Sequence, residues 1–136
     1  MAATVIVDAS FLVALLYRRD RHHGWAAAQA SQQRPPWHTC EAALSETFYL
    51  LGPVDPEPLL SLLRRRMLLS SFVLADNMAA VLTLMKKYKQ VPMSLADACL
   101  VRMTEVMSDP VVLTTDSDFR IYRRHGRQVV PCILPV

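Results

Sequence analysis

The sequence predicts a single α/β domain over residues 1–136, built on a parallel sheet of four to five strands with helices on both faces. Short apolar segments rich in β-branched residues alternate with longer segments of helical periodicity. The chain has 136 residues, of which 52% are hydrophobic, and this is enough for one compact core. Most predicted strands are apolar throughout, as expected for a sheet covered on both sides.

The first half of the chain contains two of the predicted strands. Residues Thr4–Val7 form a β-branched run, and residues 11–20 then show helical spacing with cationic residues at the end. A second, Ala-rich helix is expected over residues 22–33. A short strand at Trp37–Thr39 precedes a helix over Glu41–Leu51. Proline or glycine follows each of the last two helices and ends it.

The middle of the chain predicts a helix, a strand and another helix. Two prolines open the helical segment of residues 59–67, and residues 70–74 are typical of a strand. Asp76 is a candidate N-cap for a helix over residues 77–90, because its carboxylate can accept from backbone N–H groups of the first turn.

The last third repeats the alternation. Ser94 is the expected N-cap of a helix over residues 94–107, and a strand follows at residues 111–114. Residues 116–126 are predicted as a short helix and residues 129–134 as the final strand. Together these segments supply five strands separated by helices, which favours parallel pairing.

Composition limits the classes of function. Only 3 glycines are present, which excludes extensive Gly-rich phosphate loops. Fifteen Lys and Arg against 12 Asp and Glu give a net charge of +3, a weak indication of nucleic-acid binding. Three cysteines without metal-ligand spacing favour a reducing, cytoplasmic location. No apolar run is long enough for a membrane span, so we expect no membrane association.

Four acids occupy positions that suggest a site. Asp8 directly follows the first predicted strand, and Asp116 follows the strand of residues 111–114. Parallel sheets place their sites at the carboxyl ends of the strands. Glu46 and Asp97 lie in apolar helical segments, where a carboxylate is costly to desolvate unless a cation or hydrogen bonds compensate it.

Each acid also has a structural explanation when it is considered alone. Asp8 and Asp116 could each cap the helix that follows, Asp97 could favour a helix dipole, and Glu46 could face solvent. All four together would converge on one cleft if the sheet order permits. Such oxygen ligands suit Mg²⁺ or Mn²⁺, ions that promote hydrolysis of phosphodiesters.

Other chemistries find less support in the sequence. Ser10, Ser45 and Ser94 lack the Gly-x-Ser-x-Gly setting of a nucleophilic serine, and the four histidines lack zinc spacing. A receiver-type phosphoacceptor domain also places acids at strand ends, but it needs a lysine after a later strand, and no predicted strand is followed by one.

The strings VIVDASFLVALL, ALSETFYLL, SLADACLVRMTE and VVLTTDSDF resemble, in this order, the PIN-domain family, and most of all the toxins of VapBC toxin–antitoxin pairs. The resemblance implies a metal-dependent endoribonuclease that uses Mg²⁺ or Mn²⁺. It assigns the catalytic and metal-binding roles to Asp8, Glu46, Asp97 and Asp116. It adds Asp118 as a possible further acid, with Ser10 and Thr114 supporting the site by hydrogen bonds. Glu41 rivals Glu46, but its place at a helix start is explained by the dipole.

The same resemblance implies an RNA substrate and a cognate antitoxin as partners. The apolar segments of residues 43–51 and 59–67 suggest surplus apolar surface for a homodimer or an antitoxin. Clustered arginines are expected to contact RNA phosphates, and they are Arg64, Arg65, Arg66, Arg120, Arg123 and Arg124. The alternative is a catalytically silent module of the same fold that binds RNA or protein.

Overall fold

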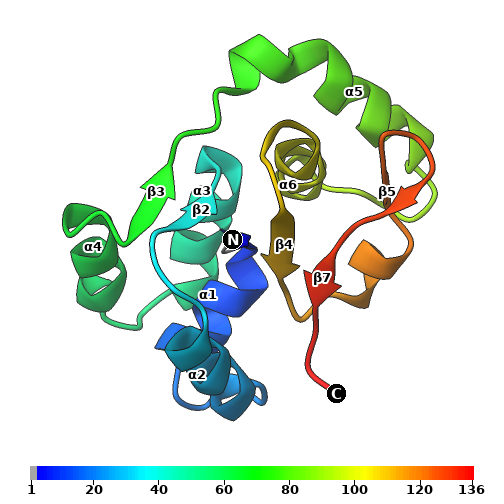
Figure 1. The fold of residues 1–136 in the computed structure, drawn as a ribbon. Helices are drawn as coiled ribbons and strands as arrows, with labels where there is room; N and C mark the ends of the chain where they lie inside the picture. The colour runs from blue at the N-terminus through cyan, green and yellow to red at the C-terminus, as the bar shows by residue number, and fades with distance from the viewer. Residues whose placement is uncertain (1–2) are drawn as a thin grey trace.

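The central feature of the fold is a five-stranded parallel sheet (Figure 1). The computed structural model describes residues 3–136. The strands are β1 (Thr4–Val7), β2 (Trp37–Thr39), β3 (Leu68–Ser70), β4 (Pro110–Leu113) and β7 (Cys132–Ile133). Their order is β3-β2-β1-β4-β7, and every pairing is parallel. The predicted fold class is therefore confirmed.

Helices and short turns connect these strands. The α-helices are α1 (Ala9–Leu16), α2 (His23–Gln32), α3 (Glu41–Leu51), α4 (Glu57–Arg64), α5 (Met78–Lys87) and α6 (Leu95–Val106). The remaining elements are the 3₁₀-helices η1 (Leu74–Asn77) and η2 (Ser117–Arg120) and the antiparallel hairpin of β5 (Arg123–Arg124) and β6 (Gln128–Val129).

Each face of the sheet has its own hydrophobic core. Side chains alternate between the faces of a strand, so neighbours on β1 enter different cores. Ile6 packs among residues of α5 and α6, whereas Val5 and Val7 pack with residues of α1, α2 and α4. Figure 1 shows α5 and α6 on one side of the molecule and α1, α2 and α4 on the other. Helices cover both faces, as the apolar strands predict.

Two predictions in the middle of the chain are wrong in detail. The strand predicted over residues 70–74 is β3, Leu68–Ser70, because residues 68–70 are those that pair with β2. Asp76 does not cap α5: it lies inside η1, and Asn77 holds the N-cap position without a side-chain cap hydrogen bond. The chain leaves the sheet at Ser70, so the β-branched character of the following residues does not extend the strand.

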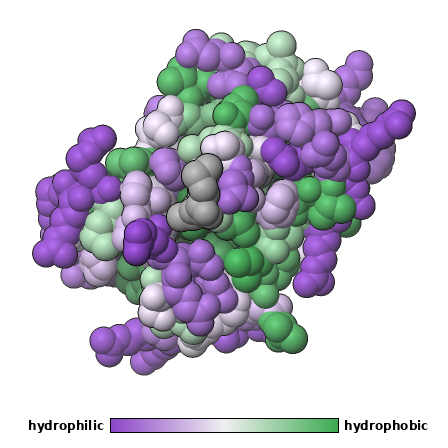
Figure 2. All heavy atoms as spheres, in the orientation of Figure 1, coloured by the Kyte–Doolittle hydropathy of each residue, from purple (hydrophilic) through white to green (hydrophobic). Residues whose placement is uncertain are grey.

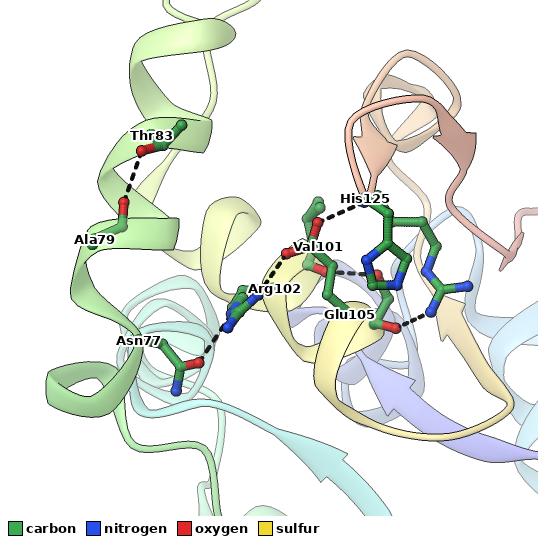
Figure 3. A network of polar contacts seen from close by, with 9 residues as sticks. Asn77, Ala79, Thr83, Val101, Arg102, Glu105 and His125 are labelled. Carbon is green, nitrogen blue, oxygen red and sulfur yellow. Dashed lines mark hydrogen bonds and ion pairs between the residues drawn. The ribbon is translucent and has the colours of Figure 1, made fainter.

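The C-terminal region also differs from the prediction. Instead of one helix over residues 116–126, the chain forms η2 and then a hairpin that reverses at His125 and Gly126, whose φ angles are +49° and +82°. Figure 3 shows Glu105 of α6 between Arg102 and His125. Glu105 Oε1 accepts from Arg102 Nη1 at 3.1 Å, and its Oε2 accepts from the backbone N–H of His125 at 2.7 Å. These tertiary contacts favour the hairpin over the local helical pattern.

The single last strand predicted over residues 129–134 is divided in two. Residues 128–129 belong to the hairpin, and residues 132–133 join the parallel sheet as β7.

The surface mixes polar and apolar side chains. On the face drawn in Figure 2, hydrophilic residues surround several separate hydrophobic patches. Within residues 3–136, no helix has the length and apolar character needed to cross a membrane.

Candidate active site

Asp8 lies at the carboxyl end of the central strand. Its backbone N–H continues the ladder by donating to the carbonyl of Leu113 at 3.1 Å, and its side chain is only 5% exposed. Asp8 occupies the N-cap position of α1 but makes no side-chain cap hydrogen bond. Instead, Oδ2 accepts from the hydroxyls of Ser10 at 2.9 Å and Thr114 at 2.7 Å. Helix capping therefore does not explain this buried carboxylate.

Ser10 and Thr114 also hold the loop that follows β4. The backbone N–H of Thr115 donates to Ser10 Oγ at 3.0 Å, and that of Asp116 donates to Thr114 Oγ1 at 3.0 Å. Thr114 is fully buried. Two hydroxyls therefore connect the end of β1 to the loop after β4 and fix the relative positions of Asp8 and Asp116.

Asp116 stands at the start of η2. Its Oδ1 accepts from the backbone N–H of Asp118 at 2.9 Å, so the capping role considered for Asp116 is present. Asp118 is half-exposed beside it. Slight burial, reinforced by the negative charge of Asp116, raises the pKa of Asp118 above its usual range.

Asp97 lies in the first turn of α6 and forms a capping box with Ser94. Asp97 N–H donates to Ser94 Oγ at 3.0 Å, and Asp97 Oδ2 accepts from the backbone N–H of Ser94 at 3.2 Å. The predicted cap at Ser94 is confirmed. The same Oδ2 accepts from the hydroxyl of Tyr122 at 3.2 Å.

Tyr122 is a site residue that the sequence analysis missed. Its side chain is fully buried, and burial beside Asp97 raises the pKa of its hydroxyl. No periodic pattern marks Tyr122, because it reaches Asp97 from a different part of the fold.

Glu46 lies on the exposed side of α3 and makes no hydrogen bond within residues 3–136. Partial burial and the charges of Asp97 and Asp116 raise its pKa. Glu41 is exposed in the first turn of α3, where the helix dipole explains an acid. This arrangement favours Glu46 over Glu41 as the member of the cluster from this helix.

The acids act on one another electrostatically. Desolvation by burial raises the pKa of Asp8 from 3.8 to about 6, opposed by the hydrogen bonds from Thr114 and Ser10 and reinforced by Asp97 and Glu46. Burial and the charge of Asp116 also raise the pKa of Asp97, against the lowering effect of its hydrogen bonds. The two ion pairs within residues 3–136, Arg64–Glu57 and Arg102–Glu105, leave these acids without a basic partner.

The three aspartates share one hydrogen-bonding pattern. Each uses a single carboxylate oxygen for protein hydrogen bonds, Oδ2 in Asp8 and Asp97 and Oδ1 in Asp116. The other oxygen of each has no hydrogen bond within residues 3–136. Each carboxylate is thus oriented through one oxygen and keeps a second one for an external ligand.

This donor set suits a hard divalent cation, because every available ligand atom is a carboxylate oxygen and no protein cation balances the charge. Within the part of the chain that the structure describes, however, no three His, Cys, Asp or Glu side chains are near enough to hold a metal ion together. The residues fit such an ion in chemistry, and the described side chains do not by themselves form a closed coordination shell.

The arginines expected to contact phosphates lie in two different environments. Arg64, Arg65 and Arg66 precede β3, and hence lie near the amino end of the sheet, whereas Asp8 follows its carboxyl end. Arg64 is also paired with Glu57. This placement does not support a contact between these three residues and RNA at the acids.

The second arginine group is partly engaged by the fold itself. Arg123 Nη1 donates to the carbonyls of Arg120, Ile121 and Tyr122, and Arg124 Nη2 donates to the carbonyl of Thr104. Arg120 is exposed, and its guanidinium makes no hydrogen bond or ion pair within residues 3–136. Of this group, Arg120 is therefore the best placed for an external phosphate.

The comparisons with known proteins agree with this fold. The PIN domain family model matches residues 5–124, and the chain belongs to this family. Its structure is similar to that of VapC20 of Mycobacterium tuberculosis, described as a toxin that cleaves the sarcin–ricin loop, with a TM-score of 0.74 and 22% sequence identity. The similarity covers 85% of this chain and 92% of VapC20, and it shows a shared fold. None of the curated proteins matches the chain.

Proposed function

We propose that the protein is a metal-dependent endoribonuclease whose active site comprises Asp8, Glu46, Asp97 and Asp116. The observation that carries this proposal is the common pattern of the three aspartates, each oriented through one oxygen and leaving the other without a protein partner. Within residues 3–136, Asp8 makes no side-chain cap hydrogen bond and no ion pair, so neither structural role accounts for its buried carboxylate.

Mg²⁺ or Mn²⁺ would be held by the unengaged oxygens of Asp8, Asp97 and Asp116, together with Glu46. When bound, such an ion supplies a nucleophile from water and stabilises charge on the phosphate. The protein's own part is to keep the carboxylates ionised and oriented. Hydroxyls of Ser10, Thr114 and Tyr122 perform this task, because hydrogen bonds to a carboxylate favour its charged form.

The lack of a closed coordination shell in the described residues is compatible with this proposal. Carboxylates without a counter-charge repel one another and favour separated positions. The free oxygens of the aspartates would hold a divalent cation, whose charge offsets that repulsion. Glu46, on the exposed side of α3 and without hydrogen bonds in the described residues, has the most freedom to approach.

The proposed partners follow from the family and the surface. On α3, the apolar side chains of Phe48, Tyr49 and Leu50 are 39%, 83% and 51% exposed. Together they favour a protein partner, either a second copy or an antitoxin, as in a VapC-type toxin. We place the activity in the cytoplasm, since the three cysteines are free thiols.

The proposal is tested by incubating purified protein with a mixed single-stranded RNA, with Mn²⁺ or with EDTA, and by repeating the assay with Asp8→Asn. We expect cleavage by the wild type with Mn²⁺ alone and none by the variant. Equal cleavage by both proteins would overturn the assignment. RNA binding without metal-dependent cleavage would instead favour the silent RNA-binding module.

A further inference from the structure

A cavity of about 490 Å³ lies next to the acids, on the side of α1. Ser10 and Thr115 form the part of its wall nearest the acids, and the linker between α1 and α2 contributes Tyr17, Arg21 and His22. Ser10 Oγ donates to Asp8 and accepts from the N–H of Thr115. A molecule in this cavity would therefore be separated from the candidate catalytic carboxylate of Asp8 by the side chain of Ser10.

The charged groups of the cavity are arranged for an anion. Arg21 is exposed and makes no hydrogen bond or ion pair within residues 3–136. The one acid in the wall, Asp20, uses its Oδ1 to accept from the backbone N–H of His22 at 2.8 Å. A guanidinium without a partner in the described residues thus lines the same cavity as Ser10, which donates to Asp8, and it suits the phosphate adjoining a scissile bond.

The remaining surface suits a nucleobase. Tyr17 is 38% exposed at the end of α1, and Val13 and Leu50 add apolar surface. A base can stack on an aromatic ring only after it has left its own helix, so aromatic contacts select unpaired nucleotides. The volume lies in the range of about 300–1,000 Å³ that is usual for small-molecule sites.

We propose that this cavity is a subsite for one unpaired RNA nucleotide next to the scissile phosphate, with its base against Tyr17 and its phosphate on Arg21. This inference rests on the proposed ribonuclease function and assigns to Tyr17 and Arg21 the binding of substrate beside the cut. Ser10 lines the cavity and donates to Asp8, and Arg21 in the same cavity complements an RNA backbone.

The test measures binding of a fluorescein-labelled 12-nucleotide RNA of mixed sequence by anisotropy, in EDTA, over a series of salt concentrations. Tyr17→Ala should weaken binding about fivefold or more, the effect of losing one stacked base, while Tyr17→Phe should preserve it. Arg21→Ala should weaken binding and reduce the slope of log affinity against log salt by about 0.7, one lost phosphate contact on a single strand.

Arg19→Ala is the matched control, because Arg19 is an exposed arginine in the same linker that does not line the cavity. It should change neither quantity. The same RNA annealed to its complement should bind more weakly and without dependence on Tyr17. Melting temperatures verify that all variants are folded. Substitutions at these exposed positions should leave folding intact.

The inference is overturned if Arg19→Ala and Arg21→Ala act equally, if Tyr17→Ala has no effect, or if the duplex depends on Tyr17 as the single strand does. A change of oligomeric state with unchanged RNA binding would assign the cavity to a protein contact and also overturn it. The proposed function can fail separately. If the wild type binds this RNA through Tyr17 and Arg21 but never cuts it, the subsite assignment stands and the nuclease assignment is wrong. If Tyr17→Ala and Arg21→Ala bind RNA normally and cut it in a metal-dependent way, the nuclease assignment stands and the subsite is overturned.

Discussion

The hydroxyl of Thr114 donates to Asp8 Oδ2 at 2.7 Å, across two neighbouring strands and from a fully buried position. The same oxygen of Thr114 accepts from the backbone N–H of Asp116 at 3.0 Å. One side chain therefore orients one proposed ligand and anchors the backbone of another. The arrangement makes Thr114 a positioning residue whose role can be separated from its size.

Replacement of Thr114 by Val should therefore damage the site while nearly preserving the shape of the core. The substitution leaves the N–H of Asp116 unpaired, which costs about 1–3 kcal/mol of unfolding free energy. It should also raise the pKa of Asp8 further, since a lowering hydrogen bond is lost. Denaturant unfolding and carboxyl titration by NMR measure the two effects. Thr114→Ser, which keeps the hydroxyl, should restore both, and an unrestored pKa would contradict the role.

Asp8→Asn and Asp97→Asn should separate ligand from structural roles. Each removes one negative charge from a crowded cluster, so the metal-free variants should melt no lower than the wild type. Mn²⁺ at 100 times its Kd should stabilise the wild type by about 2.7 kcal/mol and the variants far less. The measurement is thermal melting with and without Mn²⁺. Variants that melt lower in EDTA yet keep the full Mn²⁺ shift would show that these carboxylates are structural.

Ser94→Ala is the matched control for Asp97. It removes the hydroxyl that accepts from the N–H of Asp97 but leaves the carboxylate charge in place. Loss of this cap should lower the free energy of unfolding by about 1 kcal/mol and leave the Mn²⁺ shift unchanged. A loss of the Mn²⁺ shift in Ser94→Ala would mean that the capping box itself positions the metal ligand.

The metal-free protein should lose stability as the pH rises from about 4 to about 6. Asp8 has a folded pKa near 6, above its unfolded value of 3.8, so the folded state binds more protons in this interval. Its contribution is fully present below pH 3.8 and is lost as the pH passes 6, on the order of 2–3 kcal/mol for a shift of this size. The pKa values of Glu46 and Asp97 are also raised, so these groups act in the same direction.

Denaturant unfolding in EDTA across this pH range checks the sign, and Asp8→Asn should flatten the profile. Mn²⁺ should oppose the trend, because it competes with protons for the same oxygens. A wild-type profile that rises between pH 4 and 6 and stays unchanged in Asp8→Asn would contradict the assignment of burial as the dominant effect.

The arginines near the C-terminus should divide into two kinds. Arg124→Ala should lower stability, because its guanidinium contacts the carbonyl of Thr104, whereas Arg120→Ala should leave stability unchanged and weaken RNA binding at low salt. Unfolding and RNA-binding curves for both variants decide the matter. If Arg120→Ala and Arg124→Ala weaken RNA binding equally and Arg124→Ala loses no stability, Arg124 belongs to the RNA-binding surface.

Much of the fold was predictable from local patterns. The β-branched runs of residues 4–7 and 111–114 are central strands buried on both sides, so composition alone marks them. The edge strand was misplaced because it is short and its pairing with β2, rather than its composition, sets its limits. The hairpin at residues 123–129 could not be predicted, since it depends on Glu105 and Thr104, which are distant in sequence.

The candidate site shows the same division. Asp8 and Asp116 follow the paired central strands β1 and β4, so their common position at one edge of the sheet was predictable, and Ser94 marks the start of the helix that carries Asp97. Neither the contact of Tyr122 with Asp97 nor the hydrogen bonds from Arg123 to backbone carbonyls could be predicted from the sequence. Both depend on how the chain folds back after η2.

The two outer strands of the sheet limit how copies of this protein can associate. β3 has three residues and β7 has two, and Pro131 and Pro135 flank β7 without backbone N–H groups to donate. Edges this short are poor templates for strand addition between molecules. Assembly of this chain, with itself or with another protein, must then proceed through side chains on helices, and growth of a continuous intermolecular sheet is disfavoured from both ends.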